Sequence, residues 1–520
     1  MKKLFLCLAL SGLSQQMYGD LDSVQLLPAS ENSQDGEAPI SLGYASLHAW
    51  DPGFGSALEK DAYSIKFGGF VKADEYYSSR SFSELGITWS AREQAFCWIP
   101  IPPVYDSNGC DLTDKKRFNF IAMQTQLASL IRGPDVLNAR VQAYVEGDFF
   151  GSWIIINRRG AVRQGRSLVN SLWLRHAFVQ FDWDNVSLLM GQFWHPLLPR
   201  ESASTETVFV SAQPFEAYSR NPQIRLTVAA GDHVEFIAAA LSQVDFKTVG
   251  PELWNTRYLR NSPIPNLHGQ MRLFCGENIF GVGVDFKQYA PREFVRLQPP
   301  LYNRVKAEQT FNGTSALAYA EFYHDDFDAK FKFIYGENLA DQGMIGGYGT
   351  TCFNVIPNTS PTNLCPDAQV PGGIRSYTPM QTFACIADFS LKKKVEPGIF
   401  VGFTKNLGSK QRLADVSEFV NCGDFGPFNA LTAGKYEIYD RTYLPNGVDL
   451  NTLDYVVGVA PRLKWHKQPV TFAAELRYIQ AVYAGLKDGV RVVDCHARPC
   501  GPSRQKVDMF RFIASTYYWF

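Results

Sequence analysis

The carboxy-terminal stretch 506–520 reads K-V-D-M-F-R-F-I-A-S-T-Y-Y-W-F and ends on an aromatic residue. Its alternate residues form one row: Phe510, Phe512, Ala514, Thr516, Tyr518 and Phe520. The row between them places Arg511 and Ser515 among apolar neighbours. A period of two predicts a β-strand, because successive side chains of a strand point to opposite faces. Neither row has the composition of a dry core, so the stretch does not fit a soluble β-sandwich.

The amino terminus has the layout of a secretory signal peptide. Two lysines precede the apolar run 4–10, and small and polar residues follow up to Gly19, so we expect 1–19 to be cleaved off. The rest of the chain has no run of about 18 apolar residues, which predicts no transmembrane helix. Aromatic residues make up 14% and charged residues 19% of the chain, against roughly 25% charged in an average soluble domain. Aromatic girdles at two membrane interfaces would account for this composition.

The segment 20–61 is rich in Ser, Pro, Gly and acidic residues and has no sustained period. It is predicted to be a flexible periplasmic leader. Residues 62–520 are predicted to form the barrel, beginning with a strand at 63–77 in which apolar residues alternate with charged ones. The clearest alternation is at 137–149, where Leu, Ala and Val oppose Arg, Gln, Tyr, Glu and Asp.

Further strand patterns recur in pairs joined by tight turns. The seven predicted hairpins are 119–131 with 137–149, 172–182 with 186–194, 223–230 with 233–243, 268–275 with 279–289, 315–324 with 328–337, 378–391 with 398–407, and 453–465 with 469–482. With the first and last strands the total is sixteen, and the long connections all fall on one side. The sequence therefore predicts an all-β fold, a transmembrane antiparallel β-barrel of about 16 strands with short periplasmic turns, long external loops and a water-filled lumen.

Ten cysteines are present, and cleavage would remove Cys7 and leave an odd number. Three pairs are close in sequence inside predicted external loops: Cys97 with Cys110, Cys352 with Cys365, and Cys495 with Cys500. In an oxidising compartment these are interpreted as disulfides. Zinc ligation by Cys495, His496 and Cys500 is the alternative, and it lacks an obvious fourth ligand. The pairing of Cys275, Cys385 and Cys422 is left open.

The terminal stretch resembles the closing strand of bacterial outer-membrane β-barrels, in which a final Phe and alternate aromatic residues are read by the barrel-insertion machinery. Phe512, Tyr518 and Phe520 match that signal. With sixteen strands the chain resembles bacterial outer-membrane porins of the general type. Two stretches are similar to the DcaP-like porins: F-G-G-F-V-K-A-D-E-Y-Y-S-S-R at 67–80 and L-R-H-A-F-V-Q-F-D-W-D-N-V-S-L-L-M-G-Q-F-W at 174–194.

This resemblance implies an outer-membrane channel for small hydrophilic, often anionic, solutes. It implies a homotrimer surrounded by outer-membrane lipid and lipopolysaccharide, and a third external loop that folds into the lumen. That loop is 195–222, and its charged residues are Arg200, Glu201, Glu206, Glu216 and Arg220. The alternative is a solvated external loop.

Strand parity predicts which charged side chains line the lumen. The wall residues singled out are Lys72, Arg140, Glu146, Arg225, Arg477 and Arg511. Because the predicted inward bases outnumber the inward acids, we expect the pore to favour small anions. The alternative is that each base pairs with an acid on the next strand and only stabilises the wall.

Two other function classes are compatible with an outer-membrane barrel. A surface adhesin or structural barrel would bind a partner through its cysteine-containing loops, and conductance distinguishes it from a channel. A barrel enzyme would need an activated nucleophile, but the chain has no G-x-S-x-G, H-E-x-x-H or P-loop motif. We therefore expect no enzyme activity, no cofactor and no metal. A net charge of −1 gives no indication of nucleic-acid binding.

Overall fold

The computed structural model describes residues 25–27, 56–60, 63–83, 99–103, 105–151, 154–156, 162–164, 171–199, 203–204, 207, 212–243, 248–250, 253–296, 304–353, 375–412, 442–443, 453–487, 490–491, 498 and 504–520. The predicted signal peptide lies outside the described residues, as does most of the predicted leader. Within the described residues no helix is long and apolar enough to cross a membrane.

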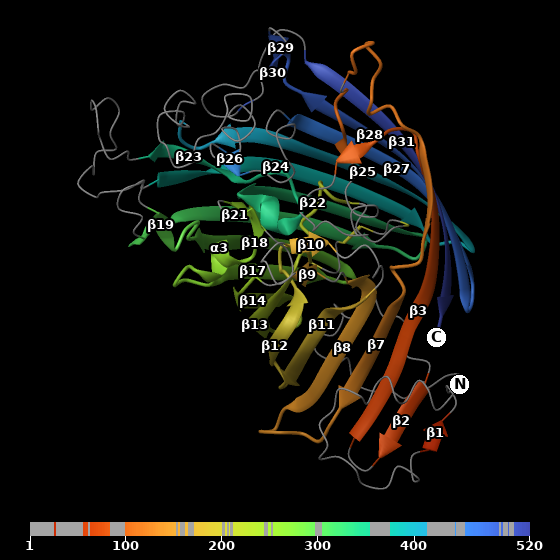
Figure 1. Cartoon of the computed structure of the whole chain (residues 1–520). Helices are drawn as coiled ribbons and strands as arrows, with labels where there is room; N and C mark the ends of the chain where they lie inside the picture. The colour runs from red at the N-terminus through yellow and green to blue at the C-terminus, as the bar shows by residue number, and fades with distance from the viewer. Residues whose placement is uncertain are drawn as a thin grey trace.

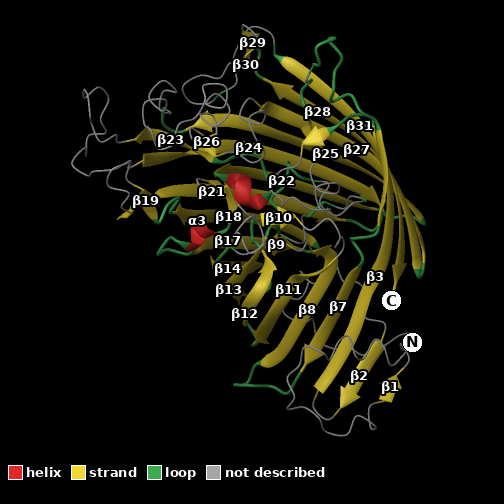
Figure 2. Ribbon diagram, viewed as in Figure 1, coloured by secondary structure: helices red, strands yellow, loops and turns green. Residues whose placement is uncertain are grey.

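Sixteen antiparallel strands form a closed barrel, as predicted (Figures 1 and 2). In wall order they are β3 (Tyr63–Ser78), β6 (Arg117–Ile121) continued by β7 (Gln126–Arg132), β8 (Arg140–Gly151), β11 (Ser171–Asp182), β12 (Val186–Trp194), β13 (Arg220–Ala230), β14 (Val234–Leu241), β17 (Asn266–Cys275), β18 (Asn278–Tyr289), β21 (Phe311–Tyr323), β22 (Phe327–Glu337), β24 (Arg375–Leu391), β25 (Val395–Ser409), β27 (Leu453–Lys467), β28 (Val470–Tyr483) and β31 (Gln505–Trp519). Pairing of β31 with β3, from Phe70↔Trp519 to Ser78↔Arg511, closes the barrel.

The predicted strand 119–131 is interrupted. β6 and β7 both pair with β3, and residues 122–125 leave the ladder between them. The hydroxyl of Thr125 in this break accepts the Lys72 N–H at 3.1 Å, so the backbone of β3 keeps a partner there. The remaining predicted strands are confirmed with small shifts at their ends.

Smaller elements accompany the sixteen wall strands, and two of them extend the ladder at one end of β24. They are β4 (Phe82–Ser83) with β5 (Ile99–Pro100), β9 (Ile154–Ile156) with β10 (Val162–Gln164), β15 (Thr248–Gly250) with β16 (Leu253–Asn255), α3 (Arg257–Arg260), β19 (Phe294–Arg296) with β20 (Arg304–Lys306), η3 (Leu339–Gln342), β23 (Tyr348–Phe353), β26 (Thr442–Tyr443), and β29 (Leu486–Lys487) with β30 (Val490–Arg491). All of them belong to the long connections at the external end of the barrel.

The short piece β2 (Ser56–Lys60) lies within the predicted leader and pairs with the start of β3, from Ser56↔Phe67 to Lys60↔Tyr63. β1 (Gln25–Leu27) pairs with β2 in turn. Because β31 reaches β3 only from Phe70 onward, β2 covers the part of this strand edge that β31 leaves open. An uncovered edge would offer unpaired backbone groups to other chains.

The barrel exterior is apolar and its interior is polar over much of the wall. On β22, Phe331, Phe333 and Tyr335 are 41%, 50% and 41% exposed, whereas Lys330 and Lys332, which alternate with the two phenylalanines, are buried. This alternation is the pattern of a strand with one face toward lipid and one toward a lumen. The side chains of Phe512, Tyr518 and Phe520 lie on the exposed outer face, as the terminal row predicts.

Deleting Phe520, or replacing it with lysine, is expected to impair insertion into the outer membrane. The residue ends the exposed aromatic row, and its backbone exchanges two hydrogen bonds with Gly69, both 3.1 Å long. The measurement is the amount of folded, heat-modifiable barrel in outer-membrane fractions after induction. Cleavage near Gly19 should be unchanged and is the control. A lysine variant that reaches the membrane at the normal level and rate would contradict the role given to this residue.

Candidate functional site

The connection between β12 and β13, which we call loop three, enters the barrel. The backbone N–H of Thr207 donates to Glu475 on β28 at 3.0 Å, and its carbonyl accepts from the Lys72 ammonium on β3 at 3.1 Å. The ammonium of Lys330 on β22 donates to the carbonyl of Ala203 at 3.1 Å. Strands β28 and β3 are separated only by β31, whereas β22 lies farther around the wall. Loop three therefore contacts two separated parts of the wall from within the lumen.

The second half of loop three reaches the wall opposite its own strands. Glu216 forms an ion pair with Lys332 on β22, and the ring of Phe215 lies 5.9 Å from that of Phe400 on β25. The segment after β22 also turns inward, because Tyr218 donates its N–H to the carbonyl of Gln342 at 2.7 Å. The described part of loop three and residues 338–347 therefore meet inside the barrel.

Most bases inside the barrel are paired with acids. The pairs are Lys72–Asp74 (3.0 Å), Arg175–Asp148 (2.8 Å), Lys287–Asp341 (2.9 Å), Lys330–Glu321 (3.3 Å), Arg462–Asp388 (2.5 Å), Arg477–Glu475 (3.1 Å), Arg175–Glu146, Arg272–Glu235 and Lys332–Glu216. The alternative interpretation, in which each inward base pairs with an acid on the next strand, describes Arg175, Arg272 and Lys330. The other bases pair with an acid on their own strand, on a more distant strand or on an inserted loop. Only bases that remain accessible in the lumen can act strongly on a passing solute.

No family model matches this sequence, and no curated protein matches it. Among solved structures, the outer membrane channel DcaP of Acinetobacter baumannii is similar over 89% of this chain and 99% of that chain, with a TM-score of 0.51 and 14% identity. The chain has the fold of an outer-membrane porin. OmpT of Vibrio cholerae (89% and 100% covered, TM-score 0.46, 9% identity) and an anion-selective porin from Comamonas acidovorans (88% and 100%, 0.44, 8%) also match.

Within this porin fold, three of the predicted wall residues contact other groups inside the barrel. Lys72 is buried between Asp74 and Thr207. The guanidinium of Arg477 lies over the ring of Phe400 at 5.4 Å. Arg511 donates to the Ser78 hydroxyl at 2.8 Å and stacks over Tyr76.

Two predicted residues have a different setting. Arg140, which is predicted to line the lumen, is exposed as the first residue of β8, beside a periplasmic turn, so it lies at the mouth of the barrel. The reason is that the strand begins at this residue, and parity says nothing about depth. Arg220 belongs to β13 and not to loop three; it stacks on Trp173 at 4.2 Å.

Other predicted site residues have mixed outcomes. Arg225 is half-buried and donates to the carbonyl of Trp194 at 2.6 Å. Glu216 of the predicted lumen loop pairs with the wall residue Lys332. Glu146 accepts from Tyr144 at 2.6 Å and from Arg175. The residues that lie outside the described part of the chain are Arg200, Glu201 and Glu206.

Cys110 is free and exposed in the structure, and Cys97 lies outside the described residues, so the predicted Cys97–Cys110 disulfide stays a prediction. The backbone N–H of Cys110 donates to the carboxylate of Asp106 at 2.9 Å in a local turn. Cys275 and Cys385 are also free. The other two proposed pairs stay predictions, because Cys365, Cys495 and Cys500 lie outside the described residues and only the backbone of Cys352 is described.

Arg175 is the wall cation that strand parity missed. The pairing of β11 with β8 shifts register between Leu174 and His176. This bulge turns both Arg175 and His176 into the barrel, where they are 2% and 1% exposed. A bulge inserts a residue into one strand and reverses the parity beyond it. No residue in L-W-L-R-H signals the bulge.

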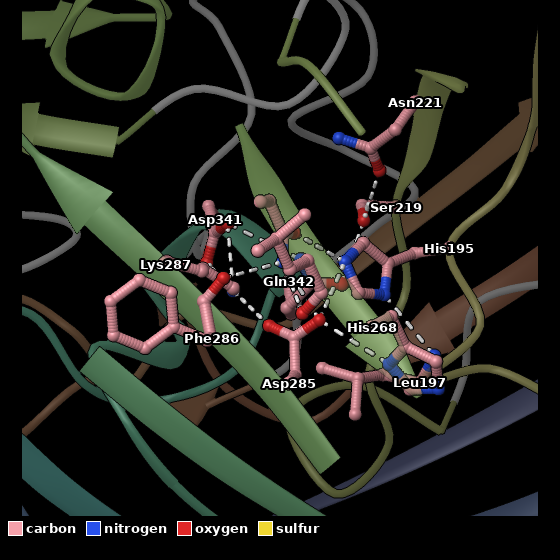
Figure 3. A network of polar contacts seen from close by, with 12 residues as sticks. His195, Leu197, Ser219, Asn221, His268, Asp285, Phe286, Lys287, Asp341 and Gln342 are labelled. Carbon is pink, nitrogen blue, oxygen red and sulfur yellow. Dashed lines mark hydrogen bonds and ion pairs between the residues drawn. The ribbon is translucent and has the colours of Figure 1, made fainter. Parts of the chain in front are cut away.

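The sequence also gave no sign of a polar network at the root of loop three (Figure 3). His195 donates from Nε2 to the side-chain Oδ1 of Asn266 at 2.8 Å, and its Nδ1 accepts the Leu197 N–H at 3.1 Å. Asp285 accepts from the Asn266 amide at 2.8 Å and lies 3.3 Å from His268 Nδ1. Burial lowers the pKa of His195 to about 3 against the opposing effect of Asp285, so the ring is neutral at ordinary pH.

Ligand atoms of His195, His268 and Asp285 all lie within 4.8 Å of one another. A histidine bound to a metal donates the proton on its other ring nitrogen to an acceptor. Coordination through Nε2 would place the ring proton on Nδ1, but Nδ1 of His195 faces the backbone N–H of Leu197, which is a donor and not an acceptor. The hydrogen bonds therefore favour a tether between loop three, β17 and β18 over a metal centre.

Proposed function

We propose that this chain is a diffusion porin of the outer membrane, which admits small hydrophilic solutes through a lumen narrowed by loop three. The observation that carries the proposal is a sixteen-stranded barrel whose third loop contacts β3, β22, β25 and β28 from within. Catalysis is not needed for this activity. The proposal includes export by the predicted signal peptide, insertion by the barrel machinery, contact with outer-membrane lipid and lipopolysaccharide, and assembly as a homotrimer.

We further propose that the pore favours anions. The opposite charges of a buried ion pair largely cancel each other's electrostatic potential at a distance. Ion selectivity therefore depends on the charges that a solute can approach. Among the inward-facing bases, Arg225 is half-buried in mid-strand, and its guanidinium lies beside Trp194 at the root of loop three. A cation beside a constriction, in a partly dehydrated space, raises the local concentration of anions.

Replacing Arg225 with glutamine is expected to shift the zero-current potential toward cation preference in a planar bilayer under a salt gradient. The shift should shrink at 1 M salt, where the Debye length is about 3 Å. Arg225→Lys keeps the charge and should keep most of the preference. Arg140→Gln is the matched control, because Arg140 is exposed at the periplasmic mouth.

Equal shifts from the two glutamine variants would place the filter away from loop three and contradict this role of Arg225. A barrel that passes no ions at all would contradict the porin proposal itself and favour an adhesive or structural barrel.

A further inference from the structure

Part of the inner wall is apolar, which is unusual for the lumen face of a water-filled barrel. On β25 and β27 the inward positions include Phe400, Val456 and Ala460, and each of them is completely buried. They belong to a cluster that also contains Ala212 and Phe215 of loop three and Ile345 of the segment after β22. The lumen face here is therefore covered by the inserted loops, because exposed apolar surface of this kind is unfavourable in water.

Two glycines leave a space without side chains on the inner face of this apolar wall, which we call the Gly402–Gly458 hole. Gly402 of β25 and Gly458 of β27 are direct cross-strand partners. A Cβ atom on Gly402 would lie 2.5 Å from the Phe215 ring, and one on Gly458 would lie 2.7 Å from it. The ring of Phe215 thus occupies the space that two missing side chains leave.

The backbone itself does not require glycine at these two positions. Neither Gly402 nor Gly458 is among the glycines with positive φ in the described chain, and both lie in regular ladder positions. What these residues provide is room for Phe215, which is 2% exposed. The neighbouring ion pair of Glu216 with Lys332 orients the loop beside the hole.

We propose that Phe215 is the residue that fixes the bore of this pore, by latching loop three into the Gly402–Gly458 hole on the opposite wall. The inference rests on the proposed porin function and adds the determinant of its size limit. Because the latch is an apolar contact, it is not weakened when salt screens the surrounding charges. The exclusion limit should therefore be the same at low and high ionic strength.

Three variants test the latch: Gly402→Val, which fills the hole, Phe215→Ala, which removes the ring, and the double variant. Each single change is expected to release loop three and raise single-channel conductance about twofold, as expected for a wider water-filled opening. Liposome swelling should then admit larger neutral sugars. The double variant should show no further increase, because residues in contact are not additive. Gly269→Val is the control, since a Cβ there meets nothing closer than Val284 at 4.0 Å.

A second readout does not depend on conduction. Chymotrypsin should cut loop three at Phe215 or Tyr218 at least tenfold faster in folded Gly402→Val than in the unchanged barrel. Faster cleavage without conduction in any variant would support the latch and overturn the porin function. Unchanged cleavage and unchanged exclusion limit in both single variants would overturn the latch. Additive increases in the double variant would also overturn it, because the two sites would then act independently.

Discussion

Replacing Gly191 with alanine is expected to stop the barrel from folding. Gly191 lies in the G-Q-F-W end of β12 with a φ of +138°, a conformation that side chains rarely adopt. A Cβ built there would lie 2.2 Å from the Ala177 carbonyl oxygen and 2.6 Å from the Phe178 Cα. These are backbone atoms of the neighbouring strand β11, which also pairs with β8 on its other side. Moving β11 away from the new Cβ atom would therefore break backbone hydrogen bonds.

The backbone conformation alone would cost about 1–3 kcal/mol, and the clash adds to that. The measurement is the folded fraction after refolding into detergent, read as the heat-modifiable band and by circular dichroism. Gly269→Ala is the matched control, because the space around it is open. A Gly191→Ala barrel that folds with normal yield and stability would show that β11 and β12 can separate, contrary to their close pairing here.

Replacing Arg175 with methionine is expected to be the most destabilising change among the inward bases. Its guanidinium forms ion pairs with two buried carboxylates, those of Glu146 and Asp148, which are 7% and 0% exposed. Removing one partner of a buried ion pair typically costs about 3–5 kcal/mol, because the remaining charge is left in a poorly solvated place. The unfolding midpoint in denaturant should fall accordingly.

Arg140→Met is the control for this experiment, since Arg140 is exposed and its loss should change the unfolding midpoint little. Adding Glu146→Gln and Asp148→Asn to Arg175→Met should recover much of the stability, because the uncompensated charges are then gone. An unchanged midpoint in Arg175→Met would mean that lumen water solvates the two carboxylates and that the pair contributes little.

The ion pairs and the apolar latch give the two parts of the interior different properties. The wall around Arg175 consists of charges that neutralise each other, whereas the wall around Gly402 is apolar and covered by loop three. Added salt is expected to screen the accessible bases but not to weaken the apolar contact of Phe215 with Gly402 and Gly458. Selectivity and size limit should therefore be separable by mutation, with Arg225 changing the first and Phe215 the second.

The sequence alone determined the barrel, its strand count and the side on which the long loops lie. A strand with one face toward lipid and one toward water repeats every two residues, and that repeat is visible in a local segment such as 328–337. The outward row of Phe512, Tyr518 and Phe520 could be assigned in the same way.

Which charges form ion pairs depends on the tertiary structure. Strand parity fails at a bulge such as the one at Leu174–His176. It also does not say how far along the barrel axis a side chain lies, as Arg140 shows. The packing site of Phe215 also depends on the tertiary structure, because this contact joins loop three to two glycines far along the chain. No local sequence pattern predicts which part of the wall an inserted loop will contact.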